Sequence, residues 1–131
     1  MSIINNLFAF LLYFAGAIAL FGGFLIAYTL VLPLHEWRLI REGNTAVALT
    51  LAGAMLGFAM PLAMAIARSE SFADMAVWAG ISLIVQLLCF GALRLAWHNA
   101  STALAQGDMA EAVILAALSV VLGLLNAACL T

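Results

Sequence analysis

Charge is scarce in this chain of 131 residues. Only 8% of the residues are charged, lysine is absent, and four arginines against six acidic residues leave a net charge of −2. Because a soluble domain carries about a quarter charged residues, this composition cannot cover a surface exposed to water. There is also no basic tail, so we expect no nucleic-acid partner.

Cysteine is scarce, and the usual catalytic combinations are missing. The two cysteines, Cys89 and Cys129, both fall inside apolar stretches, where they are expected to act as small buried residues without a disulfide framework. No Ser/His/Asp set, phosphate-binding loop or pair of intramembrane carboxylates occurs, and His35 with His98 is weak evidence for a metal. We therefore expect no enzymatic activity, cofactor or metal.

Long apolar runs are what the chain does contain. Four of them, residues 7–34, 45–67, 75–97 and 109–130, fill almost the whole sequence, and the charged residues lie between them or near their ends. Since about 20 apolar residues form a helix that crosses a bilayer, the sequence predicts an all-α transmembrane protein. We expect a four-helix polytopic bundle that forms a single integral membrane domain, 1–131, in the lipid bilayer. The apolar run continues past Ala17 with no basic region before it, so the first span is expected to be retained rather than cleaved.

The arginines predict how the chain is oriented. The connections 35–44 and 98–107 lie on the same side of the membrane as Arg38, Arg41 and Arg94, whereas the other side has only Arg68. Positive residues favour the cytoplasmic side, so both connections are expected in the cytoplasm and both termini in the periplasm.

Helix-capping residues mark two helix starts. Gly43 supplies a turn after which Asn44 or Thr45 can cap the second span. Asp108 and Glu111, three positions apart, resemble a capping box at the start of the fourth.

A weak internal repeat accompanies these caps. An offset of 64 residues aligns Gly43 with Gly107 and Asn44 with Asp108, among slightly more identities than composition alone predicts. Two repeated helix hairpins in the same orientation are thus an alternative to four unrelated spans.

Small residues form stripes along three of the four spans. Gly53, Gly57 and Pro61 recur every four residues, which favours a tight helix crossing, and the alternative is a hinge or opening beside a kink at the proline. Similar stripes occur in the fourth span at Ala112, Ala116, Ser119 and Gly123, and in the first at Ala15, Ala19, Gly22 and Ala27.

A few polar residues lie within the apolar spans. Gln86 shares a helix face with Ser82 and Cys89, and Asn126 and Thr50 lie in other spans. An amide in hydrocarbon needs hydrogen-bond partners, so these side chains either hold helices together or line a polar pathway. Near a span end, Arg94 either snorkels to the interface or forms an ion pair, with contact to a substrate or ion as the alternative.

Several motifs together carry a resemblance to a known family. They are Glu36-Trp37-Arg38-Leu39-Ile40, Gly43-Asn44-Thr45-Ala46, Gly53, Gly57, Pro61-Leu62, Trp78-Ala79-Gly80-Ile81, Val85-Gln86-Leu87-Leu88, Arg94-Leu95 and Asn126-Ala127-Ala128-Cys129. With these motifs the whole chain resembles the small bacterial inner-membrane proteins of the YjfL type, domain-of-unknown-function family three-fifty.

The resemblance implies an uncharacterised bacterial inner-membrane protein with four spans. Some family members carry the unit twice, which implies a homodimer here, and gene neighbourhoods imply membrane-stress partner proteins. The recurrent polar positions have no assigned role and correspond to Asn44, Thr45, Gln86, Arg94 and Asn126.

Two functions remain open from the sequence. The first is a non-enzymatic homo-oligomer, with a dimer favoured, or a membrane partner in an envelope-maintenance complex. The alternative is a small oligomeric transporter or channel in which Gln86, Asn126 and Thr50 line the path and Pro61 forms a gate.

Overall fold

The computed structural model describes residues 3–31, 36–96 and 100–130, all of which are helical or lie in short turns. The helices are α1 (Ile3–Val31), α2 (Glu36–Arg41), α3 (Thr45–Arg68), α4 (Phe72–Ala96), α5 (Ala100–Ala105) and α6 (Met109–Cys129). Within these ranges the side chains of Val31, Glu36, Arg94, Leu95, Ala100 and Ser101 lie outside the description.

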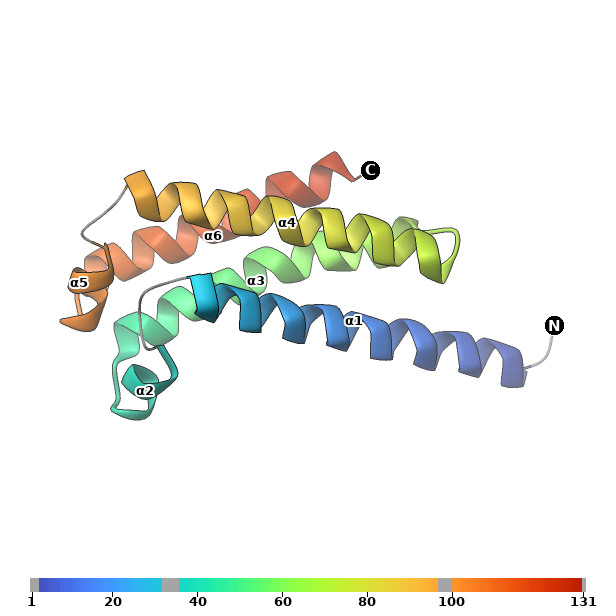
Figure 1. Ribbon diagram of the computed structural model, residues 1–131, viewed down its shortest axis with the longest axis horizontal. Coiled ribbons are helices and arrows are strands. Elements are labelled where there is room, and N and C mark those ends of the chain that lie inside the picture. The colour runs from blue at the N-terminus through green and yellow to red at the C-terminus, as the bar shows by residue number, and fades with distance from the viewer. Residues whose placement is uncertain (1–2, 32–35, 97–99, 131) are drawn as a thin grey trace.

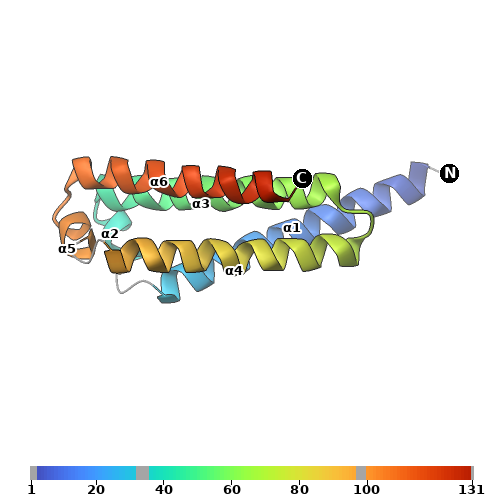
Figure 2. The same ribbon diagram turned by 90° about the horizontal axis from the view of Figure 1, so that it is seen from above.

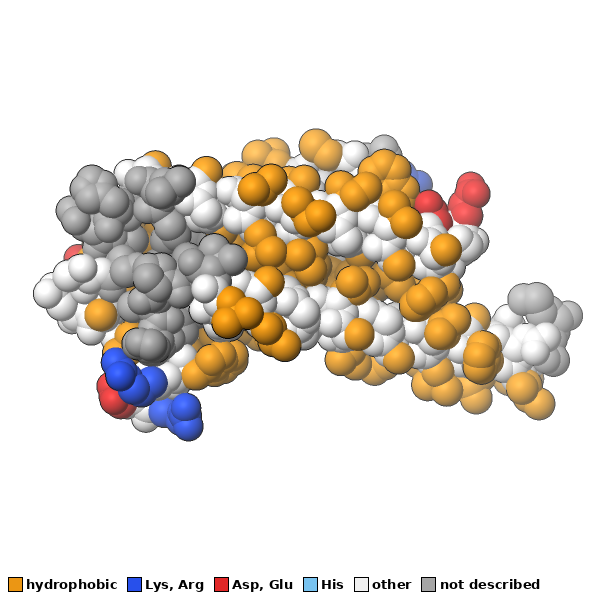
Figure 3. All heavy atoms as spheres, in the orientation of Figure 1, with side chains coloured by type: hydrophobic (Ala, Val, Ile, Leu, Met, Phe, Trp, Pro, Cys, Tyr) orange, Lys and Arg blue, Asp and Glu red, His pale blue; other side chains and the backbone are white. Residues whose placement is uncertain are grey.

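Four of the helices, α1, α3, α4 and α6, are long and apolar enough to cross a membrane. They run along one common axis, with α2 and α5 at one end and the α3–α4 hairpin and both termini at the other (Figures 1 and 2). On the face that Figure 3 shows, hydrophobic side chains cover the middle of the bundle, and the visible charged side chains lie toward its two ends. The protein therefore has the predicted all-α transmembrane fold.

The two connections at the α2 end each contain a six-residue helix. The connection between α4 and α6 includes α5, whose Leu104 is fully buried against Ala46, Val47, Ala112 and Leu115. This small apolar cluster fixes the position of α5 on the bundle, because burying the leucine side chain away from water is favourable.

The two halves of the chain have the same order of elements. Each contains a long helix, a six-residue helix, a glycine and a capped long helix, and α2 and α5 are related by the predicted offset of 64 residues. Gly43 and Gly107 both adopt positive φ, at 88° and 81°, which a side chain would strain. Asn44 and Asp108 then cap α3 and α6. The structure thus supports the repeated hairpin.

Helix α3 lies at the centre of the bundle. In the most apolar stretch of 18 residues, half of the residues of α3 are buried, compared with 6% of those of α1. On one side α3 packs closely along α6. On the other it meets α1 and α4 through an aromatic cluster, in which Phe24 stacks on Phe58 at 4.4 Å between ring centroids and Tyr28 meets Phe90 edge-on at 5.4 Å.

Candidate functional site

The contact between α3 and α6 leaves no room for side chains at three glycines. A Cβ atom at Gly53 would lie 2.6 Å from Cα of Ala116. At Gly57 it would overlap the carbonyl of Ser119, and at Gly123 the carbonyl of Gly57. The expected tight crossing at Gly53 and Gly57 is therefore present, and it brings the two backbones into contact at the middle of the bundle.

Gln86 lies where this crossing meets α4. Its side chain is fully buried, and its Nε2 donates a hydrogen bond to the backbone carbonyl of Ser119 at 3.4 Å. The glutamine Oε1 accepts a hydrogen bond of 3.1 Å from Nδ2 of Asn126, which also donates to the backbone carbonyl of Ser82 at 3.2 Å. We call the residues Ser82, Gln86, Ser119 and Asn126 the polar network; the Gln86 and Asn126 side chains join α4 to α6 beside Gly57.

Most polar groups of the polar network have hydrogen-bond partners within the chain. Ser119 donates to the carbonyl of Leu115 in its own helix at 2.9 Å, and both N–H groups of Asn126 are used. Among the described residues the buried hydroxyl of Ser82 has no hydrogen-bond partner, which makes it the least satisfied member. Since unpaired polar groups are costly in hydrocarbon, the paired amides hold α4 against α6.

Thr50 takes no part in this network. Its hydroxyl is buried and donates to the carbonyl of Ala46 at 3.0 Å, one turn earlier in α3. Pro61 is buried on the same helix, and α3 continues through it without a break. Both residues are therefore buried within the bundle.

Asn44 does more than cap α3. Its Oδ1 accepts from the backbone N–H of Val47 at 3.1 Å, which is the expected capping bond. Its Nδ2 donates to the carbonyls of Leu104 and Ala105, at 2.9 and 3.2 Å, and so closes the end of α5. Thr45 is the first residue of α3 and is exposed. Asn44 therefore ties the two halves of the chain together at the α2 end.

Asp108 caps α6 through its Oδ1, which accepts from the backbone N–H of Glu111 at 3.3 Å. The reciprocal bond of a capping box is not made, since the N–H of Asp108 donates to the carbonyl of Ala103. The predictions for Arg94 depend on a side chain that lies outside the described part of the structure. His35 and His98 also lie outside it. Among the described residues no group of three or more His, Cys, Asp or Glu is placed to hold a metal.

Part of the small-residue stripe expected in α1 is not packed against the rest of the chain. Ala15, Ala19 and Gly23, at intervals of four, are all exposed, and a Cβ added at Gly23 would meet nothing within 4 Å. The stripe expected from the sequence continued instead to Gly22 and Ala27, which are partly buried. We call Ala15, Ala19 and Gly23 the α1 stripe.

The aromatic cluster around Phe24, Phe58 and Phe90 did not emerge from the sequence. Phenylalanine is common throughout these spans, so nothing local distinguishes the buried rings from Phe8, Phe10 and Phe14, which face outward. To predict the cluster, one would need to know which rings of the three helices lie at the same level in the bundle. That depends on tertiary packing.

Comparison with known proteins matches the whole chain to one family. The family model described as Domain of Unknown Function (DUF350) matches residues 2–130. The UPF0719 inner membrane protein YjfL of Escherichia coli K12 is 35% identical over 131 residues, covering 100% of this chain and 99% of that protein. The protein of the same name from Escherichia coli O157:H7 is similar to the same extent. No solved structure matches.

Proposed function

The chain belongs to the DUF350 family and is an inner-membrane protein with four apolar helices, and from this premise we propose that it is a non-enzymatic homodimer. In this proposal the dimer serves as a membrane partner in an envelope-maintenance complex, and the α1 stripe forms its interface. The proposal puts both termini in the periplasm. It is supported by Arg38 and Arg41, which are exposed at the α2 end and favour the cytoplasmic side.

The proposal rests on one observation, that the residues of the α1 stripe are exposed. Lipid tails are as apolar as leucine, so spans associate through close packing, and small residues four apart allow it. Ala15, Ala19 and Gly23 offer this spacing on a helix whose own bundle covers little of it. In a symmetric dimer the same stripe on a second copy is a self-complementary surface.

The polar network supports a scaffold over a conduit. A pathway through the protomer would require polar groups with free hydrogen-bonding capacity around a continuous opening. Here Gln86 is fully buried and both its amide nitrogen and its oxygen are hydrogen bonded. The glycine contacts between α3 and α6 close the space beside it.

Disulfide trapping in native membranes tests the dimer. In a background with Cys89→Ser and Cys129→Ser, Ala19→Cys places a thiol at the centre of the α1 stripe. Mild oxidation is expected to link most of the protein into dimers. The matched control is Ile84→Cys, on the exposed face of α4, where little linkage is expected. Equal linkage at both positions, or none at Ala19→Cys, would contradict the proposed interface.

Two further measurements test the remaining parts of the proposal. Purification from native membranes in mild detergent is expected to return a stoichiometric partner, and its absence at high yield would remove the complex while leaving the dimer. Reconstituted liposomes are expected to show no solute flux above empty vesicles. Flux that Gln86→Leu abolishes, with folding intact, would instead establish the transporter alternative.

A further inference from the structure

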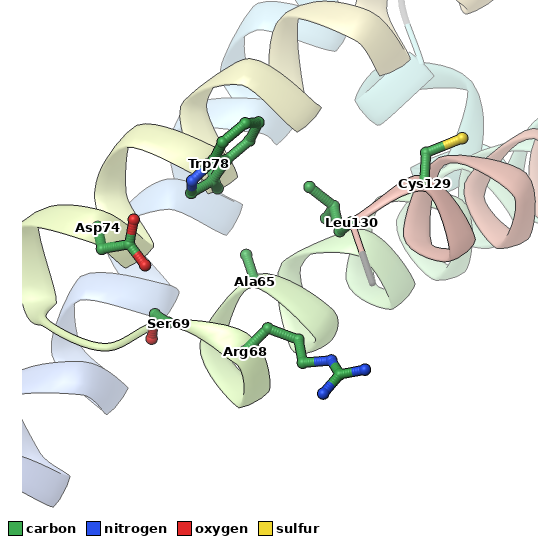
Figure 4. Close-up of a pocket in the computed structure, with 7 residues that line it drawn as sticks. All are labelled: Ala65, Arg68, Ser69, Asp74, Trp78, Cys129 and Leu130. Carbon is green, nitrogen blue, oxygen red and sulfur yellow. The ribbon is translucent and has the colours of Figure 1, made fainter.

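A cavity of about 290 Å³ lies at the end of the bundle opposite α2 and α5. Ala65, Arg68 and Ser69 line it from the end of α3, Asp74 and Trp78 from α4, and Cys129 and Leu130 from the end of α6 (Figure 4). This volume is near the lower limit for pockets that hold small molecules, which is about 300 Å³. It suits a compact polar group rather than a large ligand.

The described residues that line the cavity include one charge of each sign, Arg68 and Asp74, and these two are not paired with each other. Among the described residues the Arg68 guanidinium makes neither a salt bridge nor a hydrogen bond. One carboxylate oxygen of Asp74, Oδ2, accepts from the backbone N–H of Glu70 at 3.1 Å. A planar guanidinium is suited to bind phosphate through two parallel N–H groups, and a carboxylate is suited to bind ammonium.

The position of the cavity indicates which ligand brings both groups. Trp78, which is 47% exposed, lines it at the end of a span, where indole rings lie at the level of lipid headgroups. One and two turns further along α4, Ile81 and Val85 are exposed and apolar, so acyl chains can cover them below a headgroup held at the cavity. The polar cavity thus matches the headgroup of a lipid, and the apolar surface beside it matches the acyl chains.

We propose that this cavity binds the headgroup of a phosphatidylethanolamine lipid, with the phosphate at Arg68 and the ammonium at Asp74. The charge complementarity is specific to a zwitterion: an anionic lipid would gain the Arg68 contact but meet Asp74 without a partner. The site is separate from the α1 stripe, so it does not depend on the proposed dimer.

Native mass spectrometry of the full-length protein after delipidation tests the site by adding back defined lipids. The wild type is expected to retain phosphatidylethanolamine more than phosphatidylglycerol, which lacks the ammonium, or phosphatidylcholine, whose methylated nitrogen has no N–H donors. Arg68→Gln is expected to lower retention of all three about tenfold, as the loss of a charge-assisted hydrogen bond predicts. Asp74→Asn is expected to remove the preference for phosphatidylethanolamine over phosphatidylglycerol.

The control variants carry the same chemical changes outside the cavity. Arg41→Gln removes an exposed arginine at the opposite end, and Glu70→Gln neutralises an exposed carboxylate in the same hairpin. Both are expected to retain lipid as the wild type does. Asp74→Asn keeps an oxygen to accept from the Glu70 N–H, so the hairpin is expected to remain folded.

Two outcomes would overturn the proposal. The first is equal retention of phosphatidylethanolamine by Arg68→Gln and Arg41→Gln, both shown by circular dichroism to be folded. The second is displacement of the bound lipid by an equimolar amount of soluble glycerophosphoethanolamine, which would make a free zwitterion the ligand. Loss in Arg68→Gln together with resistance to this competitor supports a membrane lipid as the occupant.

Discussion

The α3–α6 contact and the α1 stripe both contain small residues four positions apart, but only those of the α3–α6 contact are packed against another helix of the chain. In α3, Gly53 and Gly57 are buried against α6 so closely that neither tolerates a Cβ atom. In α1, Ala19 and Gly23 have the same spacing and face away from the bundle. Small residues every four positions therefore indicate that a helix can be packed closely, without indicating whether its partner belongs to the same chain.

The difference has a physical origin in the other residues of each helix. Helix α3 lies between α6 and the aromatic cluster, so its small residues and its large residue Phe58 are buried on different sides. Helix α1 uses its large residues, Phe24 and Tyr28, to meet its own bundle. This leaves the α1 stripe on the outward face. Aromatic packing thus determines which face of α1 remains exposed.

Gly57→Leu should produce the largest effect, because the new side chain would overlap the carbonyl of Ser119 and force the two backbones apart. We expect a loss of about 3 kcal/mol or more in the free energy of unfolding, the upper range for overpacking. Unfolding of the purified protein in mixed micelles by SDS, followed by circular dichroism, measures it.

Gly91→Leu is the matched control for this variant. It lies within α4, and a Cβ atom there would meet nothing within 4 Å. Replacing a helical glycine in open space is expected to leave stability unchanged or raise it, by up to about 1 kcal/mol. Equal destabilisation by both variants would show that the α3–α6 contact is not unusually close.

Asn44→Ala should have the next largest effect, because it removes the α3 cap together with both bonds to the end of α5. We expect a loss of about 1–2 kcal/mol, typical for a strong N-cap. Hydrogen exchange should rise in the first turn of α3 and around Leu104. Asn44→Asp keeps the cap and removes the donors, so it should affect the α5 region alone; exposed Thr45→Ala should change neither.

The spans and the caps were predictable from sequence because their causes are local. A bilayer requires long apolar helices, and Asn44 and Asp108 cap the helices that follow them. The pairing of Gln86 with Asn126 was not predictable, since it depends on how α4 and α6 are rotated about their axes. The outward face of α1 was missed for the same reason, because a helix that is apolar all round does not reveal its orientation.

The cavity was missed because its residues come from the α3–α4 hairpin and from the end of α6, which are far apart in the chain. Arg68 and Trp78 are unremarkable at span ends, where such residues commonly lie in any membrane protein. Only the closeness of the α3–α4 hairpin to the end of α6 brings them together with Leu130 (Figure 4). Charged groups at the ends of spans therefore need tertiary information before they can be interpreted.

A smaller effect is expected for the link between α4 and α6. A double-mutant cycle with Gln86→Leu and Asn126→Leu should give a coupling energy of about 0.6 kcal/mol, the average for hydrogen bonds between membrane helices. The same SDS titration measures it. Pairing Gln86→Leu with Thr50→Val provides the control, because Thr50 bonds only within α3 and should show no coupling. A coupling of zero in the first cycle would mean that the amides do not join the helices.

Gly23→Leu should have the smallest effect on the protomer and the clearest effect on assembly. The added side chain meets open space in its own chain, so the free energy of unfolding measured in SDS should stay unchanged or rise by up to about 1 kcal/mol, as for Gly91→Leu. In a dimer packed through the α1 stripe, however, it would hold the two backbones apart, and light scattering in mild detergent should report monomers. Ile26→Leu, on an exposed position three residues later, should leave the dimer intact. A dimer that survives Gly23→Leu would show that the open stripe faces lipid alone, and small residues at this spacing would then indicate close packing only where, as at Gly57, the partner helix is already in the chain.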